Sequence, residues 1–319
     1  MKRQNLKPLV VTLMGATASG KTALALEIAS RVPTDIISVD SAMVYRGMDI
    51  GTAKPSKETL QNHPHALIDL RDPPDAYSAQ DFIEDADRAI RSAWARGRVP
   101  LLVGGTMMYF NVFKDGLATL PAADTNVRRI IEQRGERLGW SELHRELSAV
   151  DPVDGAAIDP SNRQRIQRAL EVYEVAGVPI SELWRNSDAE PVSKRLNCNL
   201  IEFARTTVPR EELHVRIERR LDGMLNNGFI EEVEGLRKRW GINTSTPSMR
   251  AVGFRQIGQF LETSGTGRES IDVRQSILIA TRQLAKKQST WLRGWRCLDG
   301  QSLRSGDLDT MLQKLTPLP

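Results

Sequence analysis

The alternation of apolar runs and polar segments predicts the secondary structure of the first third of the chain. Short apolar runs that end in polar or glycine residues predict strands at residues 9–14, 35–39, 66–70 and 99–103. Apolar residues at helical spacing predict helices at residues 22–30 and 78–95. Strands that alternate with helices in this way form a parallel sheet covered by helices on both faces. We therefore expect an α/β core.

The middle of the chain has a different pattern. It opens with a connector at residues 120–124 and continues with helical spacing but no strong strand. Helices are predicted at residues 126–137, 141–150 and 162–176, and a polar linker follows at residues 186–195. This pattern predicts an inserted all-helical domain at residues 118–190.

The last part of the chain returns to the core. Residues 200–203 have the pattern of another strand, and long stretches of helical spacing follow it. These stretches predict helices at residues 211–240, with a break at Gly228, and at 248–261 and 272–295. We therefore expect a discontinuous core, formed by residues 1–117 together with residues 191–319.

Composition limits the classes of protein that this chain can represent. Of its 319 residues, 40% are hydrophobic, and none of the apolar runs approaches the length of about 18 residues that a membrane span needs. The two cysteines, Cys198 and Cys297, have no paired spacing, which favours a reducing cytoplasm over a disulfide framework or a zinc site. His63 and His65 also lack metal-ligand spacing and are expected to be structural.

Charge alone does not identify a partner. The chain has 44 Lys and Arg residues against 40 Asp and Glu residues, a net charge of +4. Such a balance permits a polyanionic partner but does not require one. The kind of partner must therefore be inferred from particular residues.

The strongest local motif follows the first predicted strand. Its eight residues satisfy the P-loop pattern of G, four residues, G, K and S or T, and are Gly15, Ala16, Thr17, Ala18, Ser19, Gly20, Lys21 and Thr22. In such a loop, backbone N–H groups at a helix N-terminus surround phosphate oxygens, the lysine adds a positive charge, and the final hydroxyl can bind Mg²⁺. The flanking strand and helix argue against an ordinary glycine turn and favour a P-loop NTPase-like sheet.

Two further segments are predicted at the same edge of the sheet. Asp40 follows the second strand, where its carboxylate can ligate Mg²⁺, act as a general base or cap the next turn. Gly104, Gly105 and Thr106 follow the strand at residues 99–103 and bring backbone and a hydroxyl to this edge, or form a plain tight turn.

Two predicted helices have polar faces. In the helix at residues 162–176, Gln164, Gln167, Arg168 and Glu171 lie opposite the apolar residues Ile166, Ala169, Leu170 and Tyr173. In the helix at residues 272–295, Val273, Ile277, Ala280, Leu284 and Trp291 form the apolar side, and the opposite side carries Arg282, Lys286 and Arg293. Each polar face suits RNA, or is simply solvated.

Several strings of residues, in order, resemble the bacterial tRNA dimethylallyltransferase (tRNA isopentenyltransferase) family. They are GATASGKT, VDSAMVYRGMDIGTAKP, PHALID, LLVGGTMMYF, RALEVYEVAG and ATRQLAKKQSTWLRGW. The resemblance covers essentially residues 10–296 and is far more specific than a P-loop. The chain departs from the family at Ala16, where proline is usual, and at Phe254, where many relatives have tyrosine.

The resemblance implies a reaction and its participants. Members of this family transfer a dimethylallyl group from dimethylallyl diphosphate to N6 of the adenosine beside the anticodon of tRNA. Residues 15–22 would then hold the diphosphate, with Mg²⁺ at Thr22. Asp40 matches the general base, and Thr106 matches a threonine at the reaction centre. An enzyme acting in the cytoplasm, as a monomer and away from membranes, is expected.

The resemblance also implies contacts to tRNA and further contacts to the diphosphate. The tRNA contacts fall on Asp40, Ser41, Ala42, Met43, Arg128, Gln164, Arg165, Ile166, Gln167 and Arg168. Arg216, Arg220 and Arg255 are candidates for the diphosphate. Two other functions share the P-loop: a small-molecule kinase that uses ATP, and an RNA-binding protein switched by a nucleotide.

Overall fold

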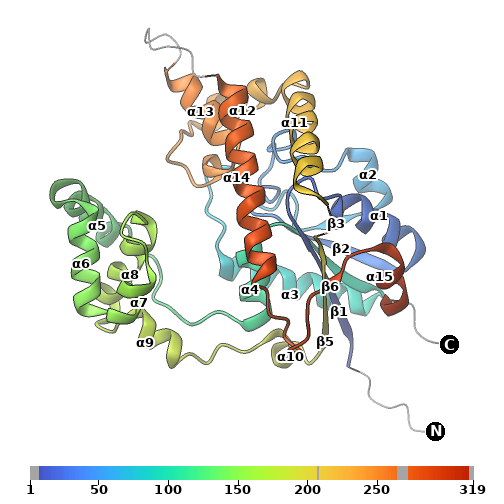
Figure 1. The fold of residues 1–319 in the computed structure, drawn as a ribbon, viewed down its shortest axis with the longest axis horizontal. Coiled ribbons are helices and arrows are strands. Elements are labelled where there is room, and N and C mark those ends of the chain that lie inside the picture. Colours follow the sequence, from blue (N-terminus) through green and yellow to red (C-terminus); the bar gives the residue numbers. More distant parts are fainter. Residues whose placement is uncertain (1–6, 207, 264–271, 316–319) are drawn as a thin grey trace. The chain divides into compact units, whose positions relative to one another are not determined.

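A computed structural model describes residues 7–206, 208–263 and 272–315. The chain divides into two compact units, which are described separately. The segment Gly116–Glu190 forms one unit, and the parts of the chain on either side of it together form the other (Figure 1). No described helix combines the length and the apolar character needed to cross a membrane.

A parallel sheet is the centre of the larger unit. Its strand order is β3-β2-β4-β1-β5-β6, and every pairing between neighbours is parallel. The strands are β1 (Leu9–Gly15), β2 (Thr34–Val39), β3 (His65–Ala66), β4 (Val99–Gly104), β5 (Asn199–Arg205) and β6 (Arg304–Ser305). Because the strands are parallel, the loops that follow β1, β2 and β4 meet at one edge.

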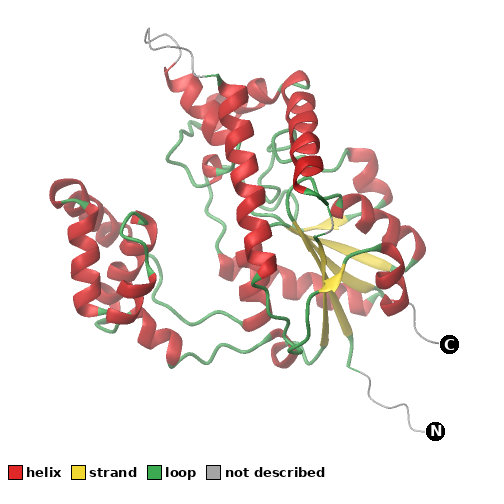
Figure 2. Cartoon of the chain, in the orientation of Figure 1, coloured by secondary structure: helices red, strands yellow, loops and turns green. Residues whose placement is uncertain are grey.

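Helices cover both faces of this sheet (Figure 2). On one face, Val11 and Leu13 of β1 pack against Leu24 and Ile28 of α1 (Lys21–Arg31) and Met311 of α15 (Leu308–Leu315). Side chains that alternate with these point to the opposite face, which α3 (Ala79–Ala95) and α14 (Val273–Arg293) contact. Burial on both faces explains why the central strands are nearly continuous apolar runs.

A second apolar cluster lies among the later helices and the loop after β2. In it, Met48 of that loop packs with Phe229 and Phe254, whose rings make an edge-to-face contact with centroids 5.0 Å apart. The elements of this region are α11 (Arg210–Asn226), α12 (Phe229–Trp240), the 3₁₀ turn η1 (Ser248–Arg250) and α13 (Phe254–Thr263), together with α14. The cluster fixes these helices against the loop that carries Asp40.

The remaining helices of the larger unit are short. They are α2 (Lys57–Asn62), α4 (Met107–Asp115) and α10 (Val192–Arg195). Ser56 caps α2 by accepting a hydrogen bond from the Thr59 N–H at 3.1 Å.

Among its described residues the smaller unit contains helices joined by loops and has no strand. Its helices are α5 (Thr125–Leu138), α6 (Trp140–Val150), α7 (Pro152–Ala157), α8 (Arg163–Ala176) and α9 (Ile180–Arg185). Their apolar faces meet in one core that includes Ile131, Leu147 and Leu170. Asn162 caps α8 by accepting from the Arg165 N–H, and Gly177 ends this helix in the left-handed region at φ 68°.

The α/β class, the parallel sheet and most of the predicted elements are confirmed, but the strand predicted at residues 66–70 is wrong. β3 ends at Ala66, because Leu67 and Asp69 have positive φ angles of 65° and 56°. The N–H of Leu70 donates instead to the Val44 carbonyl at 2.8 Å. The predicted helix at residues 248–261 is also interrupted after η1, and the linker predicted at 186–195 contains α10.

Candidate functional site

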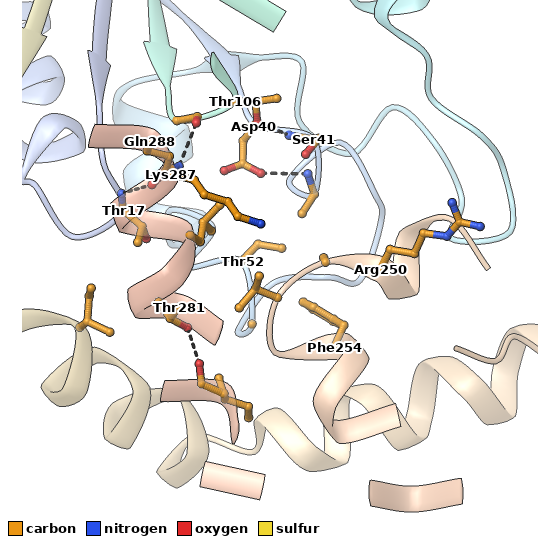
Figure 3. A pocket seen from close by; sticks show the side chains of 18 of the residues that line it. Thr17, Asp40, Ser41, Thr52, Thr106, Arg250, Phe254, Thr281, Lys287 and Gln288 are labelled. Atoms are coloured by element: carbon orange, nitrogen blue, oxygen red, sulfur yellow. Dashed lines mark hydrogen bonds between the residues drawn. The ribbon is translucent and has the colours of Figure 1, made fainter. Parts of the chain in front are cut away.

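Three loops meet at the carboxyl edge of β1, β2 and β4. They are the P-loop, the segment that begins at Asp40, and the turn at Gly104–Thr106 (Figure 3). Thr106 connects two of them: its Oγ1 accepts the Ser41 N–H at 3.2 Å, and its own N–H donates to the Val39 carbonyl at 3.3 Å. The structure thus brings together the P-loop, Asp40 and Thr106, the main site candidates from the sequence.

The P-loop has the geometry of an anion-binding turn. Ala18 and Gly20 adopt positive φ angles of 62° and 88°, and α1 begins immediately afterwards at Lys21. The first N–H groups of a helix lack partners within it, so they are available to a ligand. Gly20 is suited to this turn because the left-handed region is strained for other residues.

Lys21 lies in this loop with its ammonium group donating to the Ala16 carbonyl at 3.3 Å. Burial lowers the pKa of Lys21 from 10.5 to about 8, the Asp40 charge opposes this shift, and the Arg220 charge adds to it. An anion bound beside Lys21 would favour its protonated form.

A cavity of about 390 Å³ opens on the P-loop. Thr22, Asp40 and His65 are among the residues that line it, together with Arg216 and Arg220 of α11. Its positive charges and backbone donors suit a phosphorylated ligand. His65, for which the sequence predicts only a structural role, has a pKa lowered by burial.

A second cavity, of about 410 Å³, lies beside the first. Apolar side chains, including Phe229, Phe254 and Ile277, line part of it, and polar or basic side chains line the rest. Four residues line both cavities, and these are Thr17, Asp40, Thr52 and Arg220. The two cavities therefore adjoin at Asp40.

Asp40 uses one carboxylate oxygen to hold its own loop. Oδ1 accepts the N–H groups of Ala42 at 2.8 Å and of Met43 at 3.3 Å, so the capping role considered from the sequence is present. Within the described part of the chain, no hydrogen bond reaches Oδ2. One oxygen thus fixes the carboxylate, and the other is available to a substrate in either cavity.

The three candidate arginines for the diphosphate have different positions. Arg220 donates to Thr17 Oγ1, and burial lowers its pKa, with the Asp40 charge acting in the opposite direction. Arg216 lines the P-loop cavity and pairs with Glu212 at 2.5 Å. Arg255 is exposed on α13 and lines neither of these cavities, so the structure does not bring it to the P-loop.

The smaller unit gathers the other predicted residues around Glu171. This glutamate was expected on the exposed face of α8, but its side chain has 0% exposure. Its carboxylate accepts from the Asp124 N–H at 2.8 Å, from Arg128 Nε at 2.9 Å and from Arg168 Nη1 at 2.9 Å. These three donors compensate for its burial, which corrects the prediction.

The residues around Glu171 differ in what they can offer to RNA. Gln167 donates to the Arg128 carbonyl at 3.0 Å, whereas Gln164 and Arg165 are exposed. Ile166 has 0% exposure and belongs to the core of the unit. Its buried side chain leaves only its backbone for the predicted tRNA contact.

The side of α14 that meets the second cavity includes Ile277, Leu284 and Trp291 of the predicted apolar side, together with polar neighbours. Trp291, assigned from the sequence to the apolar side, is 43% exposed and lines this cavity with Lys287 and Gln288. Arg282, assigned to a basic stripe, instead pairs with Glu218 at 3.4 Å. Arg250 of η1 is another cavity residue that the sequence analysis missed, because no motif marks it.

The chain is similar in sequence and fold to proteins whose names describe prenyl transfer or action on tRNA. A family model described as IPP transferase matches residues 43–295. The chain is 50% identical to a protein named tRNA dimethylallyltransferase 2 from Hahella chejuensis, over 90% of this chain and 89% of the relative. The family model extends through Gly116–Glu190 and into the larger unit on both sides of it, and it begins after the P-loop and Asp40.

Solved structures agree with these matches. The full-length tRNA isopentenylpyrophosphate transferase of Bacillus halodurans is 33% identical with a TM-score of 0.63, over 97% of this chain and 94% of that one. A eukaryotic dimethylallyltransferase acting on tRNA is 21% identical and shares the fold, with a TM-score of 0.74 over 97% of this chain and 76% of that one. The chain therefore belongs to the IPP transferase family and is a prenyltransferase.

Proposed function

We propose that the protein transfers a dimethylallyl group from dimethylallyl diphosphate to N6 of the adenosine beside the anticodon of tRNA, releasing diphosphate. The observation that carries this proposal is the junction of two cavities at Asp40, one lined by the P-loop and the other by apolar and basic side chains. Family membership and the name of the relative support the coarser part of this proposal, transfer of a dimethylallyl group to tRNA.

The donor occupies the P-loop cavity through its diphosphate. Backbone N–H groups at the start of α1 bind the phosphate oxygens, and Lys21, Arg216 and Arg220 supply positive charge. Negative charge accumulates on the diphosphate as its bond to the allylic carbon breaks. These groups therefore stabilise the transition state more than the ground state.

The acceptor adenine occupies the second cavity with its amino group at Asp40. A bond forms between N6 and the allylic carbon, the bond from this carbon to the diphosphate oxygen breaks, and a proton passes from N6 to Oδ2 of Asp40. Oδ1 keeps the carboxylate in place through Ala42 and Met43. Thr106, which accepts the Ser41 N–H, orients the acceptor side of the junction.

The adenine must leave its stack to enter such a cavity. Arg250, Lys287 and Trp291 line the second cavity and offer positive charge and an aromatic face to the RNA around it. Ser41 and Ala42 line it as well. Arg128, Gln164, Arg165, Gln167 and Arg168 of the helical unit provide further tRNA contacts in this proposal.

The donor atoms of the P-loop cavity fit Mg²⁺. This ion commonly takes only one or two protein oxygens and completes its shell with substrate phosphates and water. The Thr22 hydroxyl lines the cavity and is the ligand that we propose. Among the described residues, no cluster of three or more His, Cys, Asp or Glu side chains offers a metal site built by the protein alone. Bound Mg²⁺ would neutralise charge on the diphosphate.

A labelling experiment tests this function. Purified protein is incubated with Mg²⁺, unmodified tRNA and radiolabelled dimethylallyl diphosphate, and label in the RNA is measured. Parallel incubations contain labelled ATP in place of the prenyl donor. Label in tRNA from the prenyl donor alone is the expected result, whereas phosphoryl transfer from ATP without prenylation would identify a kinase. Binding of RNA without any conversion would identify a nucleotide-switched binding protein.

Substitution of Asp40 tests its role in this reaction. Asp40→Asn keeps an oxygen that can accept the Ala42 N–H but removes the base, so transfer should fall at least about 100-fold. Diphosphate affinity should change little. Asp309→Asn, at an exposed acid of α15, serves as the matched control and should transfer normally. Transfer by Asp40→Asn at the rate of the unchanged protein would exclude Asp40 as the base.

A further inference from the structure

Gln288 joins two of the three loops of the site from a distant helix. Its Oε1 accepts the N–H of Thr17 in the P-loop at 2.8 Å, and its Nε2 donates to the Gly105 carbonyl at 2.8 Å. Figure 3 shows both hydrogen bonds, with the side chain of Gln288 reaching in from α14. The side chain is 8% exposed.

The surroundings leave this amide little freedom. A Cβ atom placed on Gly105 would lie only 2.5 Å from Gln288 Nε2 and 3.3 Å from the Gly15 carbonyl oxygen. The turn after β4 therefore approaches both Gln288 and the end of β1 closely. A buried N–H or carbonyl that loses its partner is costly, so each of the two hydrogen bonds opposes displacement of its loop.

The two loops belong to the two sides of the proposed reaction. Thr17 is part of the diphosphate loop, whereas Gly105 immediately precedes Thr106, whose Oγ1 accepts the N–H of Ser41. Thr17, Gly105 and Thr106 all line the second cavity. A single side chain thus sets the separation between the loop that holds the leaving group and the loops that hold the acceptor.

We propose that Gln288 is a positioning residue that keeps the diphosphate loop and the Gly105–Thr106 turn in register for group transfer. This inference rests on the proposed function and adds a role outside the P-loop. The amide is needed because one of its atoms must accept and another must donate. A displacement of about 1 Å between reacting groups can lower a rate by about 100-fold.

The requirement for one acceptor and one donor makes a selective test available. Gln288→Glu preserves shape, but an ionised carboxylate cannot donate to the Gly105 carbonyl. When protonated, the introduced carboxyl group can accept from Thr17 and donate to Gly105. Burial and the facing Gly105 carbonyl oxygen should raise the pKa of the introduced carboxyl group. Relative to the unchanged protein, kcat of this variant should be about 10- to 100-fold lower at pH 8.5 and should rise as the pH is lowered towards that pKa. KM for tRNA should change little.

Two further variants separate positioning from general damage. Gln288→Leu removes both hydrogen bonds and should lower kcat at every pH without recovery. Gln283→Glu, at an exposed glutamine of the same helix, introduces the same charge and should show the pH profile of the unchanged protein. All rates are referred to the folded fraction, measured by circular dichroism.

Hydrogen–deuterium exchange provides a readout that does not depend on the reaction. Exchange in a peptide containing Thr17 should accelerate in Gln288→Leu and remain unchanged in Gln283→Glu. Faster exchange together with a failed labelling experiment on the unchanged protein would overturn the proposed function but leave the bridge intact. Equal kcat in Gln288→Leu and the unchanged protein would overturn the positioning role.

Discussion

The charge on Lys21 responds to pH within a range that is accessible to experiment. Burial lowers its pKa to about 8, below the 10.5 of an exposed lysine. Between about pH 8 and pH 10.5 the folded state therefore binds fewer protons than the unfolded chain. Below about pH 8 Lys21 is charged in both states, and burial of its charge destabilises the fold. This penalty is relieved as the pH rises from 8 towards 10.5. A bound anion beside Lys21 would offset the free-energy cost of burying its charge.

Diphosphate affinity should therefore fall as Lys21 loses its proton. Between pH 7 and pH 9 we expect about a tenfold loss of affinity for inorganic diphosphate, measured by calorimetry. Lys21→Arg stays charged over this range, so the ratio of the two affinities removes the effect of the ligand's own ionisation. Lys21→Ala should bind weakly at both pH values. A ratio that does not vary with pH would mean that Lys21 does not contact the ligand.

At the scale of elements, α8 presents a row of polar groups whose orientation depends on one buried carboxylate. Glu171 holds Arg128 and Arg168, and Arg168 also donates to the Pro121 carbonyl at 2.8 Å. In the proposed function, the two arginines are therefore held in place before RNA binds. Such preorganisation reduces the entropy that binding would otherwise cost.

Arg168→Ala should weaken tRNA binding because it removes one of these charges. We expect the slope of log affinity against log salt concentration to decrease by about 1 in magnitude, as for the loss of one phosphate contact. Diphosphate affinity should be unchanged. Arg185→Ala, at an exposed arginine of α9, is the control and should bind tRNA normally. A salt dependence identical to that of the unchanged protein would exclude Arg168 from the interface.

The elements also show which structural features the sequence could predict. The bounds of α8 follow from local signals, the Asn162 cap and Gly177, and were predicted within a residue or two. The end of β3 depends on the left-handed backbone at Leu67 and on hydrogen bonds to the loop after β2, which no local pattern reveals. Apolar periodicity identified a core-facing side of α14, but the partners of Gln288 come from loops far away in the sequence.

The residues of the site also separate into those that the sequence could predict and those that it could not. The P-loop, Asp40 and Thr106 follow predicted strands, so a parallel topology places them at one edge. The burial of Glu171 could not be predicted, because an isolated helix pattern does not show the donors supplied by Asp124 and Arg128. Residues such as Arg250 and Lys287 become site candidates only once the packing of α13 and α14 forms a cavity.

At the scale of the whole molecule, the chain enters and leaves the helical unit at neighbouring points. A Cβ atom on Gly116 would lie 2.8 Å from the Glu190 carbonyl oxygen. The sheet and both apolar clusters of the larger unit are formed by residues outside Gly116–Glu190. The larger unit therefore has a complete hydrophobic core to which the inserted helical unit contributes no residue.

Replacement of residues 116–190 by a short glycine–serine linker should leave a folded protein. We expect a cooperative thermal transition and an affinity for diphosphate within about threefold of that of the full chain. Transfer to tRNA should be lost, because the arginines around Glu171 are absent. The control is the full chain with the same linker inserted after Asp75, in a loop ahead of α3. Full transfer by the deletion variant would exclude the helical unit from tRNA recognition.

The bridge made by Gln288 also bears on synthesis of the chain. Thr17 emerges early from the ribosome, but its partner lies 271 positions further along the chain. The P-loop of a nascent chain therefore lacks this constraint until α14 has been made and has docked against the sheet. A product truncated before α14 would contain the complete P-loop motif, but the Thr17 N–H would lack its hydrogen bond to Gln288. Competence for transfer is therefore acquired only late in translation.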